Sequence, residues 1–345
     1  MNFVRVALDV PLPILFDYAA AAIHPEDVGR RVLVPFGKKI AVGVIMELAE
    51  SSSLQSKRIR QVLSIMRDEP ALPADVLSLL KFCSDYYHLP LGEVVLNALP
   101  TRLRRRAQIK PDEKKAFLIT DAGRAFDVTT LGVRAEVKRT LLLLLREADE
   151  AIDEAMLFSV APTARSNLKS MIKLGLVERC VCPVSLSFRA PELSATEGPL
   201  LTNEQTTALD HIRSRPIGFT PWLLMGVTGS GKTEVYSQLI SDVLRRERQA
   251  LVLVPEINLT PQLEALVRAR FPLTTVVALH SSLNASERLR EWLTAQSGAA
   301  GIVLGTRLSI FTPLPNLDLI IVDEEHDSSF KQMDGLRYSA RDLAL

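Results

Sequence analysis

The chain has 345 residues, of which 47% are hydrophobic and 23% are charged. This balance excludes a disordered tail and a collagen-like fibre, and the length predicts two or three domains. With 41 Lys and Arg residues against 40 Asp and Glu residues, the net charge is +1. The whole molecule is therefore not a polybasic nucleic-acid coat, and any basic surface must be local.

The cysteines and the hydropathy pattern limit the cellular compartments that the sequence suits. Cys83 stands alone, and Cys180 and Cys182 form a C-x-C, with no C-x-x-C pair in the sequence. We therefore expect no zinc ligands in this chain and no secreted disulfide scaffold, and a reducing cytoplasm fits. No apolar run approaches about 18 residues and no signal-peptide core is present, so no membrane-spanning segment is expected.

Residues 1–100 are expected to form a small β-barrel-like domain closed by a helix. Val4, Val6 and Leu8 alternate with less apolar neighbours, which is the period of a strand. Strands are predicted at residues 4–8, 32–35, 40–48 and 59–66, with a hairpin turn at 36–39. Pro73 then suits the first turn of a helix.

Residues 101–115 form a predicted basic linker. The stretch 99–115 contains seven basic and two acidic residues. Most such runs are solvated linkers, and that interpretation stays open. The alternative is a hinge in which Arg104, Arg105 and Arg106 contact the phosphates of a nucleic acid.

Residues 116–190 show the pattern of a winged-helix domain. It predicts a strand at 117–120, helices at 134–147, 152–158 and 163–174, and a hairpin wing at 176–184. Gly175 follows the last helix as a natural C-cap. The alternative is a helical spacer without contact to a DNA groove, and the pattern does not separate the two.

Residues 200–345 alternate between apolar strands and helices, which predicts a parallel sheet buried on both faces. The predicted strands are Trp222–Met225, Leu251–Val254, Thr275–Leu279, Ile302–Leu304 and Leu319–Val322. The chain as a whole is therefore expected to be a multidomain α/β protein that ends in a nucleotide-binding lobe.

The phosphate-binding motif G-x-x-x-x-G-K-T stands complete at residues 226–233. Its members are Gly226, Val227, Thr228, Gly229, Ser230, Gly231, Lys232 and Thr233. A predicted apolar strand precedes it and an amphipathic helix follows, the context in which such loops cradle phosphates with backbone N–H groups. Lys232 can reach the β- and γ-phosphates of ATP, and the Thr233 hydroxyl can ligate Mg²⁺. A plain glycine-rich turn is the alternative.

A second motif ends the last apolar run. Asp323-Glu324-Glu325-His326 begins 91 residues after Lys232. Asp323 at the strand tip is expected to hold Mg²⁺, and Glu324 to polarise the attacking water. Acidic residues also cap strands without any chemistry, but their pairing with a phosphate-binding loop favours hydrolysis.

The D-E-x-H form resembles the superfamily 2 helicases and translocases, whose first lobe is RecA-like. This resemblance implies that Gln205 reads the adenine and that single-stranded DNA crosses the sheet edge at residues 254–262. It also implies a phosphate-contacting loop at residues 305–307, so Thr306 and Arg307 are expected to contact DNA.

Further motifs carry a closer resemblance that covers nearly the whole chain. They lie at residues 11–18, 31–38, 85–88, 96–100, 226–236, 254–262, 323–331 and 338–343. They resemble the N-terminal portion of the PriA family of primosomal replication-restart DNA helicases.

This resemblance implies that residues 1–100 bind the 3′ end of a nascent strand at a stalled fork. The implied pocket residues are Phe16, Asp17, Gly37 and a basic residue near Arg60. The family moves 3′ to 5′ on DNA and uses ATP, Mg²⁺ and Zn²⁺. Its implied partners are forked and single-stranded DNA, single-stranded DNA-binding protein and other primosome proteins.

The family also has a further strand of the first motor lobe, a second lobe and a zinc-binding cysteine cluster, for which this sequence offers no counterpart. Residues 200–345 are therefore expected to be a truncated first lobe, and this chain alone is expected to hydrolyse little ATP. The alternative function is a non-catalytic fork-binding fragment with a vestigial nucleotide site.

Overall fold

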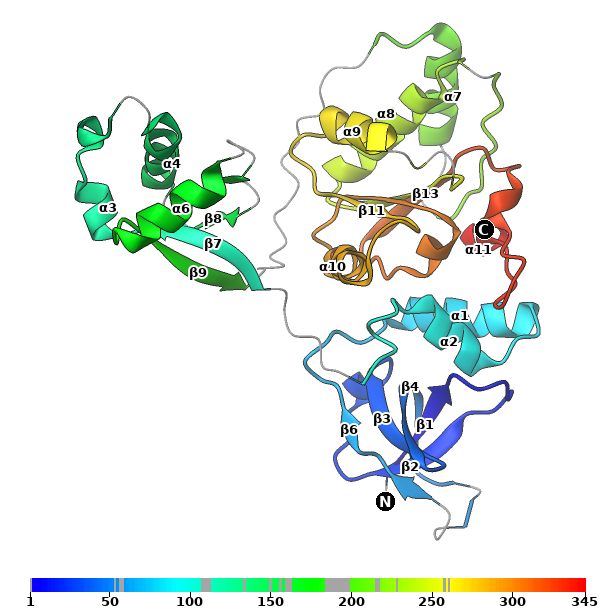
Figure 1. Cartoon of the computed structure of the whole chain (residues 1–345). Coiled ribbons are helices and arrows are strands. Elements are labelled where there is room, and N and C mark those ends of the chain that lie inside the picture. The colour runs from blue at the N-terminus through cyan, green and yellow to red at the C-terminus, as the bar shows by residue number, and fades with distance from the viewer. Residues whose placement is uncertain are drawn as a thin grey trace. The chain divides into compact units, whose positions relative to one another are not determined.

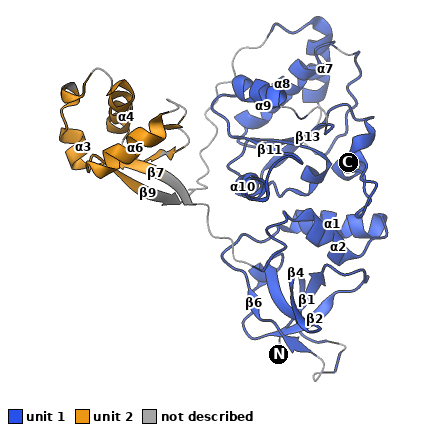
Figure 2. Cartoon of the chain, in the orientation of Figure 1, with its two compact units in different colours: residues 1–109, 187–345 blue, residues 110–186 orange. Residues whose placement is uncertain are grey.

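The computed structural model describes residues 2–52, 54–55, 59–106, 113–132, 135–148, 151–154, 157–158, 163–183, 199–214, 218–227, 229–256, 259 and 261–345. The chain divides into two compact units (Figures 1 and 2). Unit 1 comprises residues 1–109 and 187–345, and unit 2 comprises residues 110–186.

Unit 1 begins with a curled six-stranded sheet. The strands are β1 (Asn2–Leu8), β2 (Phe16–Ala20), β3 (Arg31–Phe36), β4 (Lys39–Ala49), β5 (Arg60–Gln61) and β6 (Ser64–Ile65), in the order β5-β2-β1-β4-β3-β6. Only Val62 and Leu63 separate the two edge strands β5 and β6 along the chain. The sheet must therefore curl to bring its edges together, and alternate side chains such as Val4, Val6 and Val32 fill its interior.

The sequence predicted three of these strands well and missed others. The run 59–66 forms two short strands instead of one, because β5 pairs with β2 while β6 pairs with β3. Strand β2 was not predicted, since Phe16-Asp17-Tyr18 follows two prolines and lacks a clean alternation. The hairpin is confirmed: Phe36 pairs with Lys39 across a two-residue turn in which Gly37 has a φ of 58°.

Two helices close the sheet. Helix α1 (Ala74–Tyr86) begins after Pro73 as predicted, and α2 (Leu91–Ala98) follows Pro90. Glycine at position 92 lets α2 lie directly on β1, because a Cβ there would stand 1.7 Å from the carbonyl oxygen of Leu8.

The second part of unit 1 is a four-stranded parallel sheet. Its strands are β10 (Gln249–Leu253), β11 (Val276–Leu279), β12 (Ile302–Gly305) and β13 (Leu317–Val322), in the order β11-β12-β10-β13. Its helices are α7 (Asn203–Arg213), α8 (Lys232–Arg245), α9 (Pro261–Arg270), α10 (Ala285–Gln296) and α11 (Ala340–Ala344), with a 3₁₀ helix η5 (Arg307–Phe311). Helices α8 and α9 cover one face and α10 the other (Figure 1). The alternation within β10 explains this, since Ala250 and Val252 face one cluster and Leu251 and Leu253 the other.

The predicted strand at Trp222–Met225 is wrong. Residues 218–227 form no regular element, and Leu223 and Met225 are 70% and 85% exposed. An apolar run forms a strand only where its backbone N–H and C=O groups hydrogen-bond to a neighbouring strand. Among the described residues β13 pairs with β10 alone, so the run lies outside the sheet.

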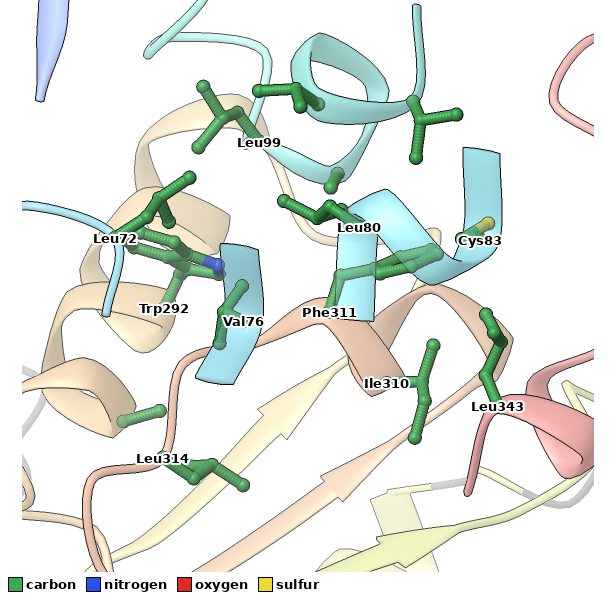
Figure 3. Packing of buried hydrophobic residues seen from close by; sticks show 14 of the residues in the cluster. Leu72, Val76, Leu80, Cys83, Leu99, Trp292, Ile310, Phe311, Leu314 and Leu343 are labelled. Atoms are coloured by element: carbon green, nitrogen blue, oxygen red, sulfur yellow. The ribbon is translucent and has the colours of Figure 1, made fainter. Parts of the chain in front are cut away.

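The two parts of unit 1 share one hydrophobic core. Residues of α1 and α2 pack against α10, η5 and α11, as Figure 3 shows for Val76, Leu80, Cys83, Leu99, Trp292, Ile310, Phe311 and Leu343. Polar contacts join the same elements. The Gln296 amide donates to the Ala71 carbonyl at 3.0 Å, and the Ser339 backbone N–H donates to the Tyr87 hydroxyl at 3.1 Å. The front sheet is thus attached to the parallel sheet through a buried seam.

This seam makes a prediction for Cys83, which is fully buried there. Burial raises the pKa of its thiol to about 12, so at pH 8 the group is almost entirely the unreactive thiol and not the thiolate. In a Cys180→Ser/Cys182→Ser background, we expect the remaining thiol to react with a disulfide reagent only as fast as the seam opens. Reaction of the native protein as fast as of the urea-unfolded chain would contradict the packing.

Unit 2 combines a three-stranded antiparallel sheet with helices. The strands are β7 (Glu113–Ile119), β8 (Ile152–Asp153) and β9 (Val177–Pro183), in the order β8-β7-β9. The helices are α3 (Asp121–Ala125), α4 (Glu136–Glu147) and α6 (Ala164–Lys173), with a 3₁₀ turn at Val128–Thr130. Leucines of α4 such as Leu141 and Leu145 pack on Leu168 and Met171 of α6.

In unit 2 the predicted helices at 134–147 and 163–174 agree with α4 and α6, and Gly175 follows α6 with a φ of 70°. The predicted helix at 152–158 is correct in part: Ile152–Asp153 form β8, and Glu154, Leu157 and Phe158 are helical, while residues 155–156 lie outside the described chain. The segment expected to fold into a hairpin at 176–184 is the single strand β9, because its partner is the distant β7. Across the described ranges of both units, no helix is long and apolar enough to cross a bilayer.

Candidate functional site

The phosphate-binding motif at residues 226–233 joins the irregular segment 218–227 to the N-terminus of α8. Gly229 and Gly231 have φ values of 81° and 80°, which favour glycine, and Gly231 is the N-cap of α8. The Ser230 N–H donates to the Val227 carbonyl at 3.1 Å, which closes the turn. Thr228 lies outside the described residues. The loop therefore ends at the positive end of a helix dipole, where phosphate is favoured.

Gln205 contacts this loop directly. Its side chain forms a capping box with Thr202 at the start of α7, and its Nε2 donates to the carbonyls of Ser230 at 3.1 Å and Gly231 at 3.4 Å. A Cβ on residue 231 would stand 2.3 Å from that nitrogen, so a side chain there would displace the Gln205 amide from the loop. The structure thus brings Gln205 to the loop.

The acidic motif begins at the carboxyl end of β13, next to β10, where the Asp323 N–H donates to the Leu253 carbonyl at 2.9 Å. Burial raises the pKa of Asp323, and the Glu324 charge adds to this; the Glu324 N–H, the Lys232 charge and a hydrogen bond from Tyr236 oppose it. The Lys232 ammonium therefore acts on Asp323 across the gap between the two motifs.

Glu324 has a φ of 49°, a conformation in which non-glycine residues are strained. Its carboxylate lies 3.7 Å from His326 Nε2. Two carboxylates thus stand side by side at one strand end, and Asp323 is half-buried, an arrangement that a bound cation stabilises. Mg²⁺ is commonly held by one or two carboxylates together with substrate phosphates, so Asp323 fits this ion. Thr233 is the second residue of α8 and the last residue of the phosphate-binding motif.

Tyr236 belongs to this site although the sequence analysis did not single it out. It lies one helical turn after Lys232, and burial first, then the charge of Asp323, raises the pKa of Tyr236 to about 12. The i, i+4 spacing from Lys232 was the available signal.

Thr306 and Arg307 follow β12. Arg307 donates to the Ser329 carbonyl at 3.0 Å and lies 3.8 Å from the Glu256 carboxylate. Residues after three different strands therefore meet at Arg307, since Glu256 follows β10 and Ser329 follows β13. Ile257, Asn258 and Thr260 of the predicted 254–262 segment lie outside the described residues.

In the front sheet, three of the four implied pocket residues come together. The Phe16 and Phe36 rings pack edge to face with centroids 5.3 Å apart, and Arg60 donates to the Gly37 carbonyl at 2.7 Å. Among the described residues outside the turn itself, no atom lies within 4 Å of a Cβ built on Gly37, so this turn is open to a ligand. Asp17 makes different contacts: it accepts from the Ser52 hydroxyl and lies 3.6 Å from Arg5 Nε, because successive side chains of a strand point to opposite faces.

Residues 101–106 are the first six residues of the predicted linker. Their arginines fold against the front part of unit 1. Arg104 donates to the Leu99 and Asn97 carbonyls at 2.9 and 2.7 Å. Arg106 donates to the Ile40 carbonyl. With Arg105, they line a cavity of about 590 Å³ over Phe36 and Ile40. Residues 107–112 lie outside the described chain.

Comparisons with known proteins match the front part and the parallel-sheet part of unit 1 to two different families. Residues 5–100 match the family described as 3′DNA-binding domain (3′BD), in its PriA form, and residues 202–344 match the DEAD/DEAH box helicase family. Replication restart protein PriA of Haemophilus influenzae is 38% identical over 352 aligned positions, which cover 100% of this chain and 47% of the relative. The PriA proteins of Chlamydia pneumoniae and Bacillus subtilis are 35% and 30% identical, over 90% and 100% of this chain and 41% and 51% of the relatives.

This chain therefore spans about half the length of the relatives that it matches. Its front sheet lies in the part that matches the 3′DNA-binding domain, and its parallel sheet lies in the part that matches the DEAD/DEAH box helicase family. The chain belongs to the PriA family of replication restart proteins.

Proposed function

We propose that this chain supplies the fork-binding part and the first motor lobe of an ATP-dependent DNA helicase. The enzyme moves 3′ to 5′ and reloads the replication machinery at abandoned forks. The observation that carries the proposal is the pairing, within unit 1, of a phosphate-binding loop facing Asp323 with a front sheet of the 3′DNA-binding type. A non-catalytic fork-binding module is not favoured, because the match to the helicase family covers residues 202–344.

The residues divide the work as follows. Residues 226–233 hold the phosphates of ATP, with Lys232 on the β- and γ-phosphates and Gln205 at the adenine. Asp323 and Thr233 hold Mg²⁺, which supplies positive charge against the phosphates. Glu324 orients the attacking water and accepts its proton. Thr306, Arg307 and Arg104 to Arg106 contact DNA phosphates.

The domain assignment follows the same division. Residues 1–100 bind the 3′ end, 101–115 link, 116–190 act as a winged-helix domain, and 200–345 form the motor lobe. Single-stranded DNA-binding protein, primosome proteins and a cytoplasmic location are part of the proposal through the family. The family also implies Zn²⁺, but within the described ranges no group of three His, Cys, Asp or Glu side chains could hold a metal ion.

DNA-stimulated ATP turnover tests the proposal. A protein of full family length is measured with and without a forked DNA. We expect hydrolysis to rise with the fork, and the 345-residue chain alone to bind Mg·ATP weakly and hydrolyse it near background. Turnover that stays at background in the full-length protein, with fork binding intact, would favour the non-catalytic alternative.

The 3′-end pocket makes a separate prediction. Asp17→Ala is expected to weaken binding to forks with a free 3′-hydroxyl at the junction by about 1–3 kcal/mol, the cost of one buried or charge-assisted polar contact. Binding to forks whose 3′ end carries a phosphate should hardly change, since that end is already excluded. The measurement is fluorescence anisotropy on both forks.

Glu47→Ala is the matched control, because Glu47 is the other carboxylate paired with Arg5, at 3.1 Å, and it is not assigned to the pocket. It should bind both forks as the wild type does. Equal losses on both forks for Asp17→Ala would mean that Asp17 only supports the fold, and its place in the pocket would be withdrawn.

A further inference from the structure

A cavity of about 350 Å³ lies where the front part of unit 1 meets the carboxyl ends of the parallel strands. Asn97 and Arg104 line it from the front part, Arg288 from α10, and Thr306 and Arg307 from the loop after β12. The loop at 332–338 closes another side. Ligands of open α/β sheets bind at this edge of the strands.

Three arginines and two carboxylates face this space. The carboxylates are Glu256 and Asp334. Glu256 lies 3.8 Å from Arg307 and offsets its charge. Arg104 and Arg288 remain as two cations near each other, and Asp334 is the remaining lining carboxylate. The cavity therefore has an excess of positive charge on the side of Arg104 and Arg288.

Both guanidinium groups are held in place by the fold. Arg104 donates Nε to the Leu99 carbonyl at 2.9 Å and Nη1 to the Asn97 side-chain oxygen at 3.0 Å. Arg288 donates Nη2 to the His280 carbonyl at 2.7 Å. A guanidinium has five N–H donors, so each retains donors beyond these contacts. Pre-oriented forks of this kind match phosphate oxygens.

The two charges also disfavour each other when the cavity holds no anion. Burial lowers the pKa of Arg104; the Asp9 carboxylate opposes this effect and the Arg288 charge adds to it. Repulsion between two half-buried cations in one cavity raises the free energy of the folded protein, and an anion bound between them would relieve it. Arg288 was not noticed in the sequence, because it is one of two arginines in α10 and its neighbours Leu289 and Trp292 mark only the buried face.

We propose that Arg104 and Arg288 together bind a backbone phosphate of single-stranded DNA, so that the front segment supplies part of the motor's DNA track. This rests on the proposed function and adds two things to it. It separates Arg104 from its neighbours Arg105 and Arg106, and it adds Arg288, a residue outside the recognised motifs. A strand bound here contacts both parts of unit 1 at once.

The test is the affinity of the 345-residue chain for labelled oligothymidylate, measured by fluorescence anisotropy at several salt concentrations. Arg288→Gln is expected to bind about tenfold more weakly, the loss of one charge-assisted contact. It should also lower the slope of log affinity against log salt by about 0.7, the value for one phosphate on a single strand. Arg104→Gln should give a similar loss, and the double variant less than the product of the two losses, because both residues act on one phosphate.

Arg290→Gln is the matched control. It lies on the same helix, does not line the cavity and pairs with Glu291 at 3.2 Å. If Arg288→Gln and Arg290→Gln reduce affinity and slope equally, the site is wrong while the proposed function stands. If the wild-type chain binds no oligothymidylate, both are wrong.

The source of the phosphate is tested in parallel by calorimetry with inorganic phosphate. Arg104→Gln also removes contacts to residues 97 and 99, so its thermal unfolding is compared with that of the wild type. If this variant is less stable than the wild type, the conclusion is drawn from Arg288→Gln alone. Loss of inorganic phosphate binding in Arg288→Gln with unchanged oligothymidylate binding would identify a free-anion site and overturn the DNA assignment.

Discussion

Lys232→Ala is expected to lower DNA-stimulated ATP turnover of the full-length protein by at least about 100-fold, the usual cost of removing a group that stabilises transition-state charge. Lys232 starts α8, its ammonium donates to the Gly226 carbonyl at 2.8 Å within the loop, and its charge acts on Asp323. No other described side chain of the motif carries positive charge. Fork binding should be nearly unchanged, because Lys232 lies outside residues 5–100, which match the 3′DNA-binding domain.

The measurement is steady-state ATP hydrolysis with saturating fork DNA, beside anisotropy on the same fork. Arg245→Ala is the control, since Arg245 is a basic residue at the other end of α8, paired with Asp242. Turnover in Lys232→Ala within a few fold of the control would remove the phosphate-binding loop from the mechanism.

Phe311→Ala is expected to lower the free energy of unfolding by about 3–5 kcal/mol, the range for a large aromatic residue removed from a core. Phe311 is 1% exposed, and its ring packs on Tyr338 with centroids 5.0 Å apart. It lies in the seam between α1 and η5 (Figure 3). Because both parts of unit 1 share that seam, we expect one unfolding transition to shift for both.

Urea unfolding followed by tryptophan fluorescence measures the change, and reaction of Cys83 in the cysteine background described above reports the front part separately. Phe82→Ala is the control: Phe82 lies on the same α1 helix but is 50% exposed, so its loss should stay within about 0.5 kcal/mol. Two separate transitions, with Phe311→Ala shifting only one, would show that the parts of unit 1 are independent.

The features that sequence predicted well are local. The phosphate-binding loop, the acidic end of β13, the strand alternation at Val4 to Leu8 and the turn at Gly37 each depend on neighbouring residues, and each lies in the predicted element. The resemblance to the superfamily 2 helicases implied Gln205, whose contact with Ser230 bridges 25 residues of chain.

The features that sequence missed depend on contacts between distant segments. The apolar face of α1 predicted a helix that packs on the front sheet. The sequence pattern of α1 did not indicate that Leu80 packs with Phe311, 231 residues later. Trp222–Met225 looked like a strand because it is apolar, yet a strand needs a partner that the pattern cannot supply. Arg104 was predicted to contact phosphate and Arg288 was not, and only folding places the two in one cavity.

The most direct test of the account is strand separation by the full-length protein on a fork with a free 3′-hydroxyl at its junction. The account predicts unwinding that requires ATP and Mg²⁺, is abolished by Lys232→Ala, and is reduced by Asp17→Ala only on this fork and not on one with a 3′-phosphate. Tight fork binding without ATP-dependent unwinding would contradict the account and leave a DNA-binding module whose nucleotide site is vestigial.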